Sequence, residues 1–85
     1  MLRTAGLNTQ SGTASATYSI PHGLPFTPYY ISVSAGSHDA LGFVSGSYAQ
    51  SFYITADNTN INITYAEGVD SGTNNLSWYW SAECN

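Results

Sequence analysis

Apolar and small polar residues alternate with a period of two along most of this chain. Alternation of this kind over several residues is typical of β-strands that bury one face. It predicts strands at residues 13–20, 29–35, 48–56, 60–66 and 75–82, with a weaker one at 40–44. No segment has the period of about 3.6 residues that marks an amphipathic helix. We therefore expect an all-β protein.

Segments rich in Gly, Pro, Asn, Asp and Ser separate the expected strands. They lie at residues 21–28, 36–39, 56–60 and 67–75. The sequence Asp-Asn-Thr-Asn at 57–60 joins two strands of similar length and predicts a tight hairpin. About six strands with turns between them indicate a small antiparallel β-sandwich, with a small barrel as the alternative.

Residues 1–12 are different: they are polar, contain glycine and show no alternation. We expect them to form a flexible tail, a linker remnant or an arm that reaches a neighbouring subunit. The remaining residues, 13–85, are expected to form a single β-sandwich domain.

The chain is short, with 85 residues, so its core is thin. Small domains often gain stability from disulfides, metals or partner subunits. Cys84 is the single cysteine, which excludes an intrachain disulfide and the cysteine-rich metal patterns. It is either a free thiol or an intersubunit bridge. We expect no cofactor, and we expect the protein to be oligomeric.

The chain has few charged residues, and its net charge is negative. Arg3 is the single basic residue against five acidic ones, and the net charge is −4. Binding of nucleic-acid phosphates relies on lysine and arginine, so that class of partner is excluded, and an anionic membrane surface is disfavoured. Charged residues make up 7% of the chain, against about 25% in ordinary soluble domains. Such a surface suits packing in an assembly, or contact with sugars and water outside a cell.

The N-terminal segment lacks the apolar stretch of a signal peptide. We expect either a protein made in the cytosol that leaves by another route, such as lysis, or a fragment of something larger. The expected location is outside the cell.

Two segments resemble known families. The sequence SIPHGLPFTPYYISVS, residues 19–34, resembles a Pro-His-Gly-Leu segment of phage and virus tail-fibre and spike domains. The sequence FYITADNTNINITYAEGVDSGTNNLSWYWSA, residues 52–82, is similar to the C-terminal half of H-type lectin-like domains. The resemblance implies a six-stranded sandwich that forms homotrimers and holds ligands in loops near subunit contacts. It also implies a ligand-binding role for Asp39.

Four residues are candidates for ligand binding: His38, Asp39, Asp70 and Tyr79. His38 and Asp39 are adjacent on a loop expected to be extended, so their side chains are expected to point apart and form no dyad. Asp39 and Asp70 suit contacts with sugar hydroxyls, or simple capping of turns. Tyr79 lies opposite the face of Trp78, where it suits sugar stacking or a subunit contact.

Four further residues are candidates for turns and interfaces: His22, Gly23, Tyr30 and Tyr53. His22 is either a metal ligand or polar contact at a trimer axis, or a structural corner whose ring bonds to backbone; we favour the corner. No second histidine or cysteine lies near it in sequence, so no metal site is expected. Gly23 is expected to supply a positive φ. Tyr30 and Tyr53 lie opposite the buried sides of their strands and suit subunit contacts.

No catalytic residue is expected. The chain lacks the G-x-S-x-G motif that presents a serine nucleophile, and nothing indicates a cleft holding the carboxyl pair of a glycosidase. Asn62 and Asn75 each begin an N-glycosylation pattern, which an Asn-, Ser- and Thr-rich chain also produces by chance.

These observations favour a non-enzymatic structural or receptor-binding module of a virus particle, which associates with itself as a homotrimer or larger homopolymer. A cell-surface glycan is the expected further partner. One alternative is a secreted carbohydrate-binding lectin. Another is a self-assembling filament, tube or capsid subunit whose N-terminal arm exchanges with neighbours. A hydrolase ranks last.

Overall fold

The structure is a computed structural model, and it describes residues 1–44 and 48–85. The strands are β1 Leu2–Gln10, β2 Thr17–Pro21, β3 Tyr30–Ala35, β4 Phe43–Val44, β5 Tyr48–Ala49, β6 Phe52–Ala56, β7 Asn60–Tyr65 and β8 Leu76–Cys84. A short 3-10 turn, η1, spans Asp39–Leu41. None of the described segments is a helix with the length and hydropathy of a membrane span.

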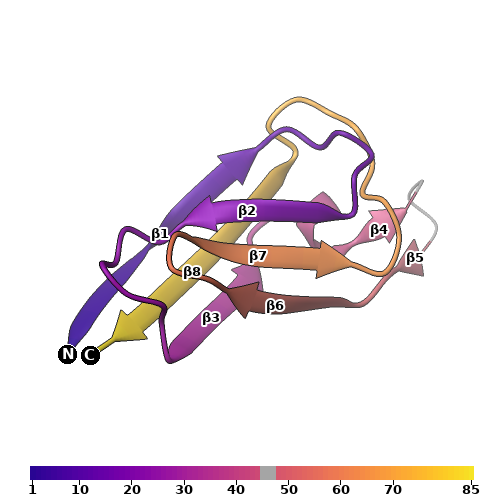
Figure 1. Ribbon diagram of the computed structural model, residues 1–85. Coiled ribbons are helices and arrows are strands. Elements are labelled where there is room, and N and C mark those ends of the chain that lie inside the picture. The colour runs from indigo at the N-terminus through magenta and orange to yellow at the C-terminus, as the bar shows by residue number, and fades with distance from the viewer. Residues whose placement is uncertain (45–47) are drawn as a thin grey trace.

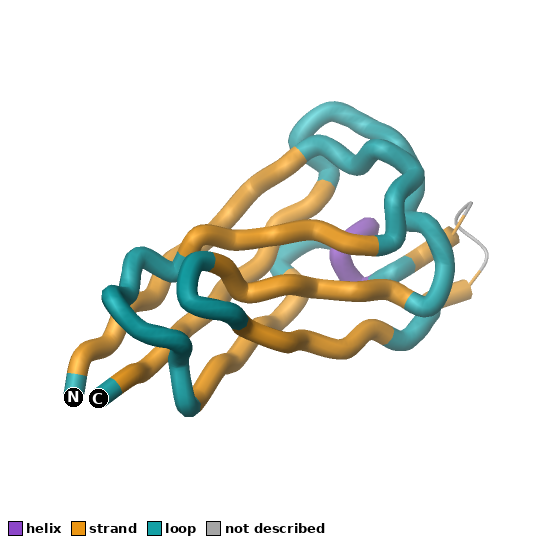
Figure 2. Tube along the Cα trace, viewed as in Figure 1, coloured by secondary structure: helices purple, strands orange, loops and turns teal. Residues whose placement is uncertain are grey.

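Two three-stranded antiparallel sheets face each other in a sandwich-like arrangement (Figures 1 and 2). Sheet A has the strand order β1-β8-β3, and sheet B has the order β2-β7-β6. Strands β4 and β5 form a separate two-stranded ribbon. Both termini lie at one end of the molecule, and η1 and the ribbon lie at the other (Figure 1). The predicted all-β antiparallel fold is confirmed.

The core lies between the central strands β8 and β7. Every second residue of these strands points inward, as the period of two predicts. The inward residues that are buried are Leu76, Trp78, Ala82 and Cys84 from β8 and Ile61, Ile63 and Tyr65 from β7. Tyr18 and Ile20 of β2 complete the buried face of sheet B.

A polar relay crosses this apolar core from one sheet to the other. The indole N–H of Trp78 donates to the Tyr65 hydroxyl oxygen at 2.9 Å, and that hydroxyl donates to the carbonyl of Ala40 in η1. The Tyr18 ring packs against both aromatic rings, with centroids 5.8 Å from Trp78 and 6.3 Å from Tyr65. Burial raises the pKa of the Tyr65 hydroxyl, which keeps it a donor. The relay therefore satisfies buried polar atoms that would otherwise be costly.

The prediction of a flexible arm at residues 1–12 is wrong, because residues 2–10 form β1 at the edge of sheet A. The sequence shows no alternation there because four of the five inward positions of β1 carry a polar residue or glycine, namely Thr4, Gly6, Asn8 and Gln10. Thr4 donates through Oγ1 to the carbonyl of His22 at 2.6 Å, and Gln10 donates through Nε2 to the carbonyl of Ser19 at 2.8 Å. Hydrogen bonds rather than apolar alternation thus hold β1 against the β2 side of the sandwich.

Three other strand predictions need adjustment. The strand expected at 13–20 begins only at Thr17, because Ala14 adopts a positive φ of 62° that ends any extended run. The segment 40–44 is split between η1 and β4 rather than forming one strand. The strand expected at 48–56 is divided into β5 and β6: the chain leaves β5 at Gln50, whose buried side chain accepts a hydrogen bond from the amide of Glu67.

The predicted hairpin at 57–60 is confirmed and joins β6 to β7. Asp57 Oδ1 accepts hydrogen bonds from the amides of Thr59 at 2.8 Å and Asn60 at 2.7 Å. These bonds from Asn60 and Thr59 lower the pKa of the Asp57 carboxyl. The turn is thus closed by the aspartate side chain, as turn chemistry leads us to expect.

His22 forms the corner after β2. Its ring is 1% exposed; Nδ1 accepts from the amide of Leu24 at 3.0 Å, and Nε2 lies 2.9 Å from the carbonyl of Asp57. Because Nδ1 is an acceptor, the proton of the neutral ring must lie on Nε2, which donates to that carbonyl. Gly23 has the expected positive φ, 73°. The geometry fits the interpretation of His22 as a structural corner rather than as an exposed ligand.

Candidate functional site

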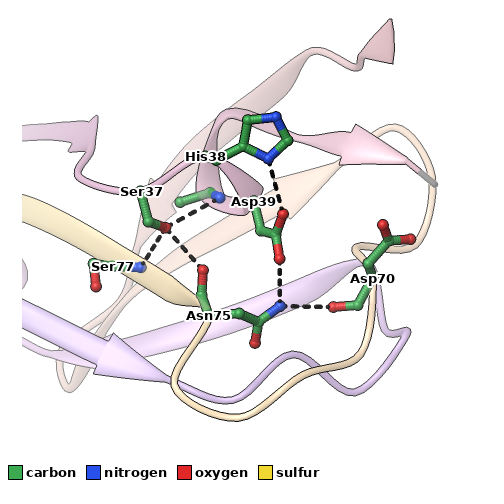
Figure 3. A network of polar contacts seen from close by, with 7 residues as sticks. Ser37, His38, Asp39, Asp70, Asn75 and Ser77 are labelled. Atoms are coloured by element: carbon green, nitrogen blue, oxygen red, sulfur yellow. Dashed lines mark hydrogen bonds and ion pairs between the residues drawn. The ribbon is translucent and has the colours of Figure 1, made fainter. Parts of the chain in front are cut away.

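A cluster of polar side chains gathers around Asn75, directly before β8 (Figure 3). The Asn75 Nδ2 group donates to Asp39 Oδ2 at 2.8 Å and to the backbone carbonyl of Asp70 at 3.1 Å. On its other side, Asn75 Oδ1 accepts from the amide of Gly12 at 2.7 Å. One side chain therefore joins three loops that are far apart in the sequence.

Ser37 fixes the backbone of the same cluster. Its hydroxyl donates to the carbonyl of Asn75 at 2.9 Å and accepts from the amide of Ser77 at 3.1 Å. It also lies 3.4 Å from the amide of Ala40, at the start of η1 (Figure 3). The hydroxyl acts as donor and acceptor at once, which serine allows. The loop that carries His38 and Asp39 is thereby tied to the first residues of β8.

Gly12 is glycine because of a close backbone approach. A Cβ at this position would lie 2.1 Å from the carbonyl oxygen of Asp70 and 3.0 Å from Nδ2 of Asn75. No larger residue fits there without moving backbone. The loop after β1 thus meets the loop before β8 only because residue 12 has no side chain.

His38 and Asp39 lie next to each other at the surface of the cluster. His38 Nδ1 is 3.1 Å from Asp39 Oδ1, and the imidazole stacks on the ring of Phe43 with centroids 4.1 Å apart. Hydrogen bonds from Asn75, and then from His38, lower the pKa of the Asp39 carboxyl. The expectation that the two side chains point apart is wrong, because the chain begins a 3-10 turn here instead of remaining extended.

The structure brings together three of the four candidate ligand residues. His38 and Asp39 contribute side chains, whereas Asp70 contributes its backbone carbonyl to Asn75. Tyr79 lies elsewhere, on the outer face of sheet A, beside Gly36. Asn75 and Ser37 were missed as site residues. The N-glycosylation pattern was the only signal at Asn75, and in the folded chain its amide is already engaged.

The remaining candidates lie outside the cluster. Tyr30 is the first residue of β3, and Tyr53 is on the outer face of β6. Both are exposed, at 51% and 63%. His22 and Gly23 lie at the corner already described, remote from Asn75 in the sheet pairing.

The cluster offers an open surface for contact with a ligand. Over residues 1–44 and 48–85, no pocket is formed and no group of three or more His, Cys, Asp or Glu side chains is placed to hold a metal ion. What the surface presents is a carboxylate held in position, an exposed imidazole and an aromatic ring beneath it. A carboxylate oxygen accepts hydrogen bonds from hydroxyl groups, so this chemistry suits a polyhydroxylated ligand.

No protein-family model, curated protein or solved structure matches this chain.

Because the pKa of Asp39 is lowered, the stability of the folded protein should depend on this carboxyl in a way that changes with pH. A carboxyl whose folded pKa lies below its unfolded value contributes stability above about pH 4, and that contribution is lost as the pH falls through the folded pKa. We expect Asp39→Asn to be less stable than the parent at pH 7 and to approach it at about pH 2. Urea unfolding at several pH values measures this difference.

Asp57 provides an internal reference for the same experiment. Its pKa is lowered by hydrogen bonds within its own hairpin, which is separate from the Asp39 cluster. The Asp39→Asn variant should therefore still lose part of its stability as the pH falls. A stability difference between variant and parent that stays constant from neutral to acid pH would contradict the assignment of the lowered pKa to Asp39.

Proposed function

We propose that this chain is a non-enzymatic structural and receptor-binding module of a virus particle, of the tail-fibre or spike type. Copies of it associate through charge-poor sheet faces, as a homotrimer or a larger homopolymer. The observation that carries the proposal is that the outer faces of both sheets carry little charge, and that the outer face of sheet A exposes apolar and aromatic side chains. The resemblance of residues 13–82 to tail-fibre and H-type lectin-like domains supports it further.

The outer face of sheet A is large and almost uncharged. Residues opposite each other in an antiparallel pair share a face, so Leu7 and Tyr79 lie side by side on this one. They are 56% and 57% exposed. Arg3 and Glu83 are the charged residues at its outward positions, and they pair with each other at 3.7 Å. Little on this face opposes its burial against another protein.

The outer face of sheet B is also uncharged, but it is more polar. Its outward residues are Thr17, Ser19 and Pro21 of β2, Asn60, Asn62 and Thr64 of β7, and Tyr53 and Thr55 of β6. Several of these bond to one another, as Ser19 does to Asn62 at 2.7 Å. Because these hydroxyl and amide groups satisfy each other, burying them costs less than burying unpaired polar groups.

Exposed tyrosines and leucines without surrounding charge are typical of contact surfaces. Interface cores are enriched in aromatic residues and depleted of charged ones. A soluble monomer of this size gains its solubility from charge, which is scarce here. The same surface that leaves a monomer poorly solvated therefore suits a domain that is built into a particle.

The arrangement of the two ends supports a receptor-binding role for the loop cluster. The Asn75 cluster and η1 lie at the end of the sandwich opposite the chain termini (Figure 1). In a fibre or spike attached through one end, the other end faces the target. His38 and Asp39 are the residues that this end would present.

Self-association is the measurable consequence. Light scattering over a concentration series should show an oligomer with a defined number of 9.1 kDa chains rather than a monomer. Because the buried surface carries little charge, raising the salt concentration to about 1 M should leave the association intact. A mass that stays at that of one chain at every concentration would contradict the proposal.

A carbohydrate-binding lectin is the second candidate, favoured by the held carboxylate of Asp39 beside the His38–Phe43 stack. Titration with a panel of sugars, followed by NMR, should then shift resonances of His38, Asp39 and Asn75, and Asp39→Ala should abolish the shifts. Resonances that stay unchanged with every sugar would remove this candidate while leaving the structural role intact.

A further inference from the structure

β1 is an edge strand whose outer edge meets no other strand among the residues described. It pairs with β8 without interruption, from Leu2 opposite Cys84 to Gln10 opposite Leu76, and within the described chain its backbone bonds to no other backbone segment. Nine residues of strand extend about 30 Å. Along that length, a row of amide and carbonyl groups points away from β8 and is a ready template for another strand.

The usual protections of an edge strand are missing from β1. It contains no proline, no lysine and no bulge, and Arg3 is its single charged residue. The β2 edge of sheet B is protected, because side chains of β1 donate hydrogen bonds to its backbone carbonyls. Gln10 donates to the carbonyl of Ser19, and Thr4 donates to the carbonyl of His22, the residue after β2. β1 thus covers another edge while its own stays open.

We propose that β1 pairs antiparallel with β1 of a second copy of this chain, about a two-fold axis at Gly6. The two A sheets then join into one continuous sheet of six strands. This register is the one that pairs all nine residues, with Ala5 opposite Leu7 of the second copy and Arg3 opposite Thr9. The proposal rests on the proposed self-association. It adds the β1 edge to the sheet faces as a contact surface, and among the proposed assemblies its two-fold symmetry selects a homopolymer with an even number of chains over a homotrimer.

The side chains of β1 are self-complementary in this register. Leu7 of each copy meets Ala5 of the other, which extends the apolar strip that Tyr79 and Leu7 already form on the outer face of sheet A. At the axis the two Gly6 residues present no side chains to each other. No residue pairs with one of like charge.

Charge also favours this edge over the rest of the surface. Each copy carries a net charge of −4, so two copies repel wherever acidic residues meet. β1 contains no acidic residue and holds the single basic one, Arg3. Among the surfaces of the molecule, its edge is therefore a place where two copies approach without that repulsion.

Charged substitutions on the outer face of β1 test both whether the β1 edge forms the contact and whether its register is correct. In Ala5→Lys/Leu7→Lys, each lysine faces a lysine of the second copy, whereas in Ala5→Lys/Leu7→Glu each lysine faces a glutamate. Both positions are exposed, so neither change disturbs the core. Asn58→Lys/Thr59→Lys is the control, because it adds the same two lysines at exposed positions of the β6–β7 hairpin, outside both sheet faces and outside β1. Sedimentation or light scattering of each full-length variant gives its dissociation constant.

The two-lysine variant of β1 should dissociate at least about tenfold more readily than the parent, since like charges directly opposite each other destabilise a strand pair. The lysine–glutamate variant and the hairpin control should both associate like the parent. The parent assembly should contain an even number of chains.

Other outcomes overturn the proposal in separable ways. The β1 pairing is overturned if the parent associates but the two-lysine change does not weaken it, or if the assembly has an odd number of chains. Both outcomes remain compatible with self-association. Equal weakening by the lysine pairs of β1 and of the hairpin also overturns the β1 pairing. A monomeric parent at every concentration overturns both the pairing and the proposed function.

Discussion

The hydrogen bond from Trp78 to the Tyr65 hydroxyl is the interaction on which the arrangement of this small domain depends. It joins the central strand of sheet A to the central strand of sheet B, and the same hydroxyl continues to the carbonyl of Ala40. A chain of 85 residues has little apolar area with which to orient two sheets. A satisfied polar relay within an aromatic core adds direction to that packing, because each of its bonds has a preferred geometry.

The relay connects the core to the candidate site. Ala40 is the buried residue of η1, and it directly follows Asp39, whose carboxylate bonds to Asn75. The core thus holds one side of the loop cluster, while Asn75 and Ser37 hold the other side against the start of β8. The cluster is hydrogen-bonded at its base and exposed at His38. In our proposal, this end of the molecule serves recognition, while the sheet faces and the β1 edge serve contacts between copies.

Much of the fold was predictable from sequence, because alternation and turn chemistry are local signals. The buried faces of β7 and β8 and the Asp57 hairpin follow from them directly. β1 was not predictable, because most of its inward residues are polar, and Thr4 and Gln10 among them bond to distant carbonyls such as that of His22. The site was predictable only in part: Asp39 and His38 were named, but their contact depends on the 3-10 turn. The role of Asn75 depends on three loops meeting, which no local pattern records.

Amide hydrogen exchange on Tyr65→Phe tests most directly whether the relay fixes the loop of the site. The variant keeps the ring and removes only the hydroxyl, and Tyr18→Phe makes the same change elsewhere in the aromatic core as a control. Our account predicts that the amides of Leu41 and Gly42, which close η1, lose far more protection than the amides of β7 do in Tyr65→Phe, and that Tyr18→Phe spares them. An equal loss of protection across η1 and β7, or unchanged protection in η1, would contradict it.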